Sequence, residues 1–190
     1  MKLVDEKYCT RWCSEYDVLV PGNVDVFFDG KEVNRKKSVF FTERYARCAS
    51  LVVSLSYYFG EFNTESLFWM REWGRGSPEL EDIGYSHWKG LRPHPERDSF
   101  EEYPGHLCDP DDAEHVRALL LLAMVNSWDA IWIQKGGQSL INICHDGYIT
   151  AATRGQREKD IVAWLNEWQS GPYPLKKPSL FRRILNRATH

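Results

Sequence analysis

Four side chains of the kinds that bind metal ions lie close together in the sequence: His106, Cys108, Asp111 and His115. Imidazole, thiolate and carboxylate groups are the usual ligands of zinc. Asp111 and His115 are four residues apart, so on a helix they would share one face. The spacing matches neither the HExxH nor the CxxC pattern. These residues form a candidate zinc site, and the alternative is that Asp111 and His115 are an ordinary surface pair.

A second group, Cys144, His145 and Asp146, has the residue types of a nucleophile, a base and an orienting acid. Consecutive strand residues point to opposite faces, whereas a catalytic cysteine and histidine must lie within hydrogen-bonding reach. We therefore interpret Asp146 as a turn residue before Gly147, Cys144 as a packed strand residue, and His145 as a contact residue at the tip of a hairpin.

The chain carries eight tryptophans in 190 residues, and three pairs of them are spaced i to i+4. The pairs Trp128/Trp132 and Trp164/Trp168 fall in neighbouring elements, and we expect them in the interior. Trp69, Trp73 and Trp88 have arginines and tyrosines nearby, which is the composition of binding hot spots. The predicted binding face comprises Trp69, Trp73, Arg75, Tyr85, Trp88 and His145.

The clearest expected elements lie in the C-terminal half. Residues 110–126 are predicted to be a helix, because Asp109 can cap it and Pro110 suits its first position. Capping also explains the acidic run that begins the helix. Three short strands follow in an antiparallel meander at about 129–152, with turns at Gly136-Gly137 and at Asp146-Gly147, the latter expected as type I′. Both faces of the strands are apolar, which predicts cover on both sides. A second helix is expected at 158–169.

The N-terminal half has weaker patterns. A strand is expected at 24–28, and a long apolar segment at 42–59 favours a helix, although residues 51–58 would also suit a strand. Asn63 or Thr64 is expected to cap a short helix through Trp73. A long loop then covers about 74–108.

These elements predict an α+β fold in which the meander packs against helices and is joined by an N-terminal strand and helix. We expect one domain over residues 1–171, followed by a basic tail at 172–190. The tail is expected to dock on the acidic body; the alternative is a peripheral contact with a membrane or a partner.

Charge and cysteine usage limit the classes of function. The net charge is −3, and residues 1–170 hold 27 acidic against 19 basic side chains, which argues against nucleic-acid binding. Five cysteines without CxxC spacing indicate free thiols and a cytoplasmic location. The longest apolar run, residues 118–125, is too short for a membrane span, which needs about 20 residues.

The sequence therefore predicts a non-enzymatic cytoplasmic protein-binding module of the adaptor, inhibitor or immunity type, with an acidic, tryptophan-rich face and a protein partner that is basic. No cofactor is required by this reading. The alternative is a small metal-assisted hydrolase, with zinc at the histidine-rich loop.

Overall fold

The computed structural model describes residues 1–20, 27–28, 39–40, 45–72 and 102–154. Within these residues the main element is an antiparallel sheet with the strand order β1-β6-β5-β7-β8-β9-β4. Its strands are β1 (Lys2–Val4), β4 (Val39–Phe40), β5 (Ser66–Glu72), β6 (Gly105–Cys108), β7 (Asp129–Gln134), β8 (Ser139–Cys144) and β9 (Tyr148–Thr153). A separate two-stranded ladder pairs β2 (Val18–Leu19) with β3 (Phe27–Phe28).

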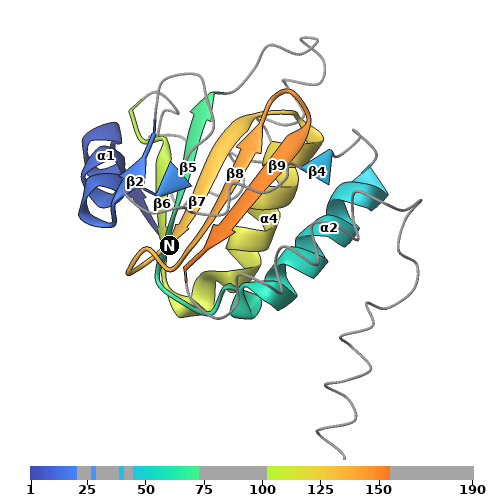
Figure 1. Ribbon diagram of the computed structural model, residues 1–190, viewed down its shortest axis with the longest axis horizontal. Helices are drawn as coiled ribbons and strands as arrows, with labels where there is room; N and C mark the ends of the chain where they lie inside the picture. Colours follow the sequence, from blue (N-terminus) through green and yellow to red (C-terminus); the bar gives the residue numbers. More distant parts are fainter. Residues whose placement is uncertain (21–26, 29–38, 41–44, 73–101, 155–190) are drawn as a thin grey trace, which may run out of the picture.

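Helices cover both faces of the main sheet, as the two apolar faces of the meander predict (Figure 1). Helices α2 (Tyr45–Tyr58) and α4 (Ala113–Val125) pack together on one face, over a core that includes Phe68, Trp132 and Ile141. Helix α1 (Glu6–Glu15) packs on the other face, over a smaller cluster that includes Trp69 and Ile131. The predicted α+β fold, with N-terminal elements joining the meander, is confirmed.

The meander forms as expected, although one of its turns differs from the prediction. Gly136 and Gly137 have positive φ angles of 80° and 61° in the β7–β8 turn. In the β8–β9 turn Gly147 has a φ of 82°, but Asp146 is not among the residues with positive φ. Cys144 pairs with Tyr148, so the turn is a three-residue loop with glycine in the left-handed position and not a two-residue type I′ turn.

The predicted helix after Asp109 is confirmed, with a short 3-10 turn (Pro110–Asp112) at its start. Asp109 and Asp112 form a reciprocal capping box, in which the Asp109 amide donates to Asp112 Oδ2 at 3.0 Å. Asp112 also forms an ion pair with the Met1 ammonium group. The acidic run therefore caps the helix, as expected. The predicted helix at 42–59 is present as α2.

The prediction of a helix between Asn63 and Trp73 is wrong, because Ser66–Glu72 form strand β5. This strand is central and pairs with both β6 and β7. Residues Leu67 to Met70 point alternately to the two faces of the sheet, and all four are buried. The strand therefore lacks the alternation of polar and apolar residues by which a strand is recognised in a sequence. The loop expected at 74–108 also ends earlier, since Gly105–Cys108 form β6. Of the strand expected at 24–28, Phe27–Phe28 form β3.

Gly105 allows α1 to lie close against the sheet. A Cβ atom at Gly105 would lie 2.4 Å from Cys9 Sγ and 2.6 Å from Val4 Cγ2. Asp5 begins the helix by accepting a 2.8 Å hydrogen bond from the Tyr8 amide. The position of α1 is therefore set by its N-terminal cap and by a close approach to β6.

Several sequence predictions lie outside the described residues, namely the helix at 158–169, the pair Trp164/Trp168 and the basic tail at 172–190. Trp128 and Trp132 are 4% and 0% exposed, so their predicted interior position is confirmed. All five cysteines are free thiols, as expected. No helix within the described ranges has the length and apolar character needed to cross a bilayer.

Candidate functional site

A groove of about 770 Å³ runs between α1, β2 and the end of β5. Its size is in the usual range of ligand-binding pockets. The residues lining it come from α1, from the β2 segment, from the end of β5, from the residue before β6 and from the start of β7: Glu6, Thr10, Cys13, Ser14, Val18, Leu19, Val20, Trp69, Met70, Arg71, Glu72, Pro104 and Asp129.

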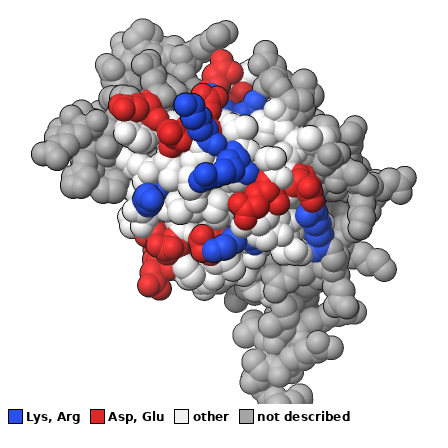
Figure 2. Space-filling model, turned by 90° about the vertical axis from the view of Figure 1, so that its left-hand side faces the viewer, with Lys and Arg blue, Asp and Glu red and all other residues white. Residues whose placement is uncertain are grey.

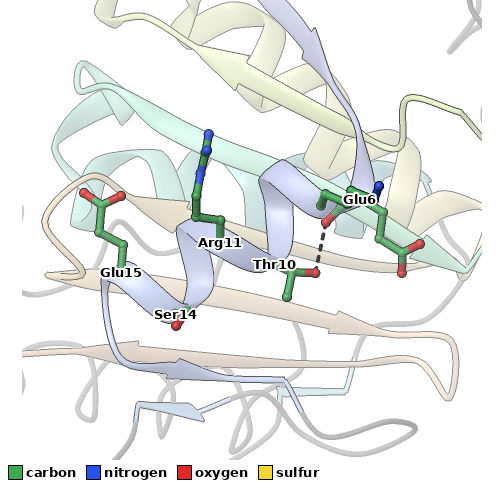
Figure 3. Close-up of a pocket in the computed structure, with 6 residues that line it drawn as sticks. Glu6, Thr10, Arg11, Ser14 and Glu15 are labelled. Atoms are coloured by element: carbon green, nitrogen blue, oxygen red, sulfur yellow. Dashed lines mark hydrogen bonds between the residues drawn. The ribbon is translucent and has the colours of Figure 1, made fainter.

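One wall of the groove is helix α1. Glu6, Thr10 and Ser14 repeat every four residues, so they share one face of the helix. The Thr10 hydroxyl donates to the Glu6 carbonyl at 2.9 Å, and Figure 3 shows this bond along the helix. The same three residues also border a more open hollow on the outer surface of α1, together with Lys7, Arg11 and Glu15. Polar groups thus form the helical wall.

The side of the groove formed by the strands is lined by both apolar and charged side chains. Trp69 on β5 is 7% exposed, and the Arg71 guanidinium lies 6.0 Å from the centre of its ring. A register shift between Met70 and Glu72 interrupts the pairing of β5 with β7 at this point, and such irregularities re-aim side chains at the ends of strands. Leu19 on β2 is 40% exposed. The groove therefore combines apolar side chains with charged groups.

The two signs of charge are mixed around this side of the molecule. Figure 2 looks onto the side that carries α1 and shows basic side chains near the centre, with acidic ones on either side of them. Among the groove residues themselves, Glu6, Glu72 and Asp129 are acidic and Arg71 is basic. The residues that line the groove therefore include more acidic than basic side chains.

Asp129 connects the groove with the β8–β9 turn. Its Oδ1 accepts a 2.6 Å hydrogen bond from the His145 amide, and its Oδ2 lies 3.0 Å from His145 Nδ1. The other ring nitrogen, Nε2, lies 3.5 Å from Asp146 Oδ1. Cys144 completes the group, since ligand atoms of Asp129, Cys144 and His145 all lie within 4.8 Å of one another.

The ionisation of this group follows from its contacts. The hydrogen bond to Asp129 is the main reason that the pKa of His145 lies above its ordinary value. Burial raises the pKa of Cys144, and the nearby carboxylates add to this effect. The Cys144 thiol is therefore protonated at neutral pH, while the His145 ring carries a larger share of positive charge than a free histidine.

The structure describes two of the six residues of the predicted binding face. Trp69 lies in the groove, and His145 lies at the hairpin tip, as expected, with 51% of its side chain exposed. Asp129 lies between them, because it lines the groove and binds His145. Trp73, Arg75, Tyr85 and Trp88 lie outside the described residues.

The four predicted metal ligands are not gathered into one cluster. His106 and Cys108 are fully buried in β6, whereas Asp111 and His115 are exposed at the start of α4. His115 Nδ1 lies 3.6 Å from Asp112. In the part of the chain that the structure describes, the group of three side chains with close ligand atoms is instead Asp129, Cys144 and His145.

Asp129 was missed as a candidate residue, although the sequence contains a signal for it. The Gly136-Gly137 turn fixes the register of the β7–β8 hairpin, in which Ala130 pairs with Ile143. That register places Asp129 next to Cys144 and His145.

Comparisons with models of protein families, with curated proteins and with solved structures gave no match.

Proposed function

We propose that this chain is a non-enzymatic cytoplasmic protein-binding module of the adaptor, inhibitor or immunity type. Its partner is a protein that inserts a basic segment into the groove between α1 and β5. The observation that carries the proposal is the combination of apolar side chains with three carboxylates in the lining of the groove. Interfaces between proteins commonly combine apolar and polar groups in this way.

The apolar part of the groove suits the stem of a long basic side chain. Lysine and arginine bury their methylene groups against apolar surface while the charged end stays in contact with polar groups. Leu19 and Trp69 supply such a surface. Leu19 is also one of two large apolar side chains that are exposed among the described residues, the other being Val53 on α2.

The charges at the groove favour a basic occupant. The lining of the groove includes three carboxylates, those of Glu6, Glu72 and Asp129, and one cationic group, that of Arg71. A partner with lysine or arginine at its tip gains favourable interactions with these carboxylates and associates faster. The same carboxylates repel the phosphates of a nucleic acid, which agrees with a protein as the partner.

The chemistry of Cys144 and His145 supports binding more than covalent catalysis. Burial raises the pKa of the Cys144 thiol, whereas a catalytic thiol needs a lowered pKa. The five free thiols support a reducing compartment, and hence the cytoplasmic assignment.

The proposal is tested by site-specific photo-crosslinking in the cells that produce the protein. A photoreactive residue is placed at Leu19 in the groove or at Val53 on α2, because both positions are exposed and apolar. The proposal predicts one defined protein product from position 19 and none of that product from position 53. The same product from both positions, or no product from position 19, would contradict it.

A further inference from the structure

We infer that Asp129, Cys144 and His145 form a binding site for one divalent ion of the zinc class. This site is distinct from the four residues at 106–115 that the sequence indicates. It also does not depend on the proposed partner, although Asp129 belongs to both the site and the groove.

The geometry of the three side chains is close to that of a zinc site. Ligand atoms about 2.0–2.3 Å from a tetrahedral zinc ion lie about 3.3–3.7 Å from one another. Here Asp129 Oδ2 and His145 Nδ1 are 3.0 Å apart, and the ligand atoms of the three residues lie within 4.8 Å. An ion would therefore enter with small movements of the side chains.

The chemistry of the ligands also selects this class of ion. A thiolate, an imidazole and a carboxylate together favour zinc and similar transition metals over magnesium or calcium, which prefer oxygen ligands alone. When the metal binds at Nδ1, the ring releases its Nδ1 proton to solvent and stays neutral with the remaining hydrogen on Nε2, while Asp129 binds as the carboxylate. Cys144 releases its thiol proton to solvent and binds as the thiolate.

The surrounding structure holds the ligands in place. Asp129 is the first residue of β7, and Cys144 is the last residue of β8, in the register set by the β7–β8 hairpin. Asp146 Oδ1 lies 3.5 Å from Nε2 of His145. A carboxylate near the second ring nitrogen is the usual outer partner of a metal-bound histidine, because it favours the tautomer with a lone pair toward the metal.

The site is open to solvent on one side. The side chains of Asp129 and His145 are 18% and 51% exposed, and Cys144 is partly buried. Three protein ligands and an open fourth position are the arrangement of zinc sites that bind water or an external group. An external ligand from solvent or from a bound partner can therefore complete the coordination.

The test is titration of the metal-free full chain with Co²⁺, followed by the absorption of the thiolate-to-cobalt charge-transfer band. We expect a one-to-one end point, loss of the band in Cys144→Ser, and an affinity at least about tenfold lower in Asp129→Asn and His145→Gln. His115→Gln is the matched control, since His115 is also an exposed histidine, with 46% of its side chain accessible.

Circular dichroism of each variant shows whether it keeps the fold. A band that persists in folded Cys144→Ser, or one that is lost equally in His115→Gln, would overturn the assignment. So would the absence of saturable binding to the wild-type chain. Zinc displacing Co²⁺ from the wild-type protein with the same stoichiometry would support it.

Discussion

Asp129 holds His145 with both of its carboxylate oxygens, one on the backbone amide at 2.6 Å and one near Nδ1 at 3.0 Å. The contact joins the first residue of β7 to the turn that follows β8. It therefore fixes the β8–β9 turn relative to the groove, which Asp129 also lines.

This pair makes stability depend on pH. Because the folded-state pKa of His145 is raised above the unfolded value, its contribution is fully present below the unfolded pKa and is lost as pH rises through the folded pKa. The ring is half exposed, so we expect less than about 1 kcal/mol. Urea unfolding of wild type and His145→Gln between about pH 5 and about pH 8 tests this.

The wild-type advantage over His145→Gln should shrink as pH rises across that range. A difference that stays constant, or one that grows with pH, would show that the ion pair with Asp129 is not its source.

Cys144 should be the thiol that reacts first with an alkylating reagent. Burial raises the pKa of Cys13 and Cys108 to about 12, and these side chains are enclosed. Cys144 is partly exposed, although its own raised pKa keeps its reaction slow at neutral pH. Mass spectrometry after brief labelling of the native protein should find the first modification there, and Cys144→Ser should abolish it. Equal early labelling of Cys13 or Cys108 would contradict the described burial.

Gly137 is required by the contact between the β7–β8 turn and the end of α1. A Cβ atom there would lie 2.9 Å from both the Cβ and the carbonyl oxygen of Tyr16, whereas Gly136 has nothing within 4 Å. Both residues have positive φ, so alanine at either costs about 1–2 kcal/mol. Gly137→Ala should cost about 1–3 kcal/mol more because of the clash. Denaturant unfolding of the two variants measures the difference, and equal losses would be inconsistent with the contact.

Trp132 is the centre of the core beneath α2 and α4. It is fully buried and makes edge contacts with Phe59 and Phe62, at centroid distances of 5.4 and 5.0 Å. Trp132→Ala should lower the free energy of unfolding by about 3–5 kcal/mol. The control Val53→Ala, at a 67% exposed position, should change it by about 0.5 kcal/mol or less. A small loss at Trp132 would contradict the core assignment.

The predictability of each element depended on whether its signal was local. The β7–β8–β9 meander was predictable because its turns contain Gly136, Gly137 and Gly147, and the helix at 113–125 because Asp109 and Pro110 mark its start. Strand β5 was not predictable, because the elements that bury both of its faces are distant in sequence.

The N-terminal elements and the site show the same contrast. Helix α1 also has local signals in the sequence, namely the cap at Asp5 and the apolar residues Cys9, Trp12 and Cys13. For the site, His145 was identified as a contact residue, but its partner Asp129 required the pairing register of β7 and β8. The candidate ligands at 106–115 were adjacent in sequence, yet β6 buries His106 and Cys108 while Asp111 and His115 stay at the surface.

The central claim is that a basic segment of a partner protein binds in the groove. Its most direct test is the rate at which the Glu6→Lys variant associates with the partner that is crosslinked from position 19. Glu114→Lys is the matched control, because Glu6 and Glu114 both lie in the first turn of a helix, on α1 and α4. We predict association about tenfold slower or more for Glu6→Lys, with weaker salt dependence, and an unchanged rate for Glu114→Lys. Equal rates for the two variants, or faster association of Glu6→Lys, would contradict a basic partner segment in the groove.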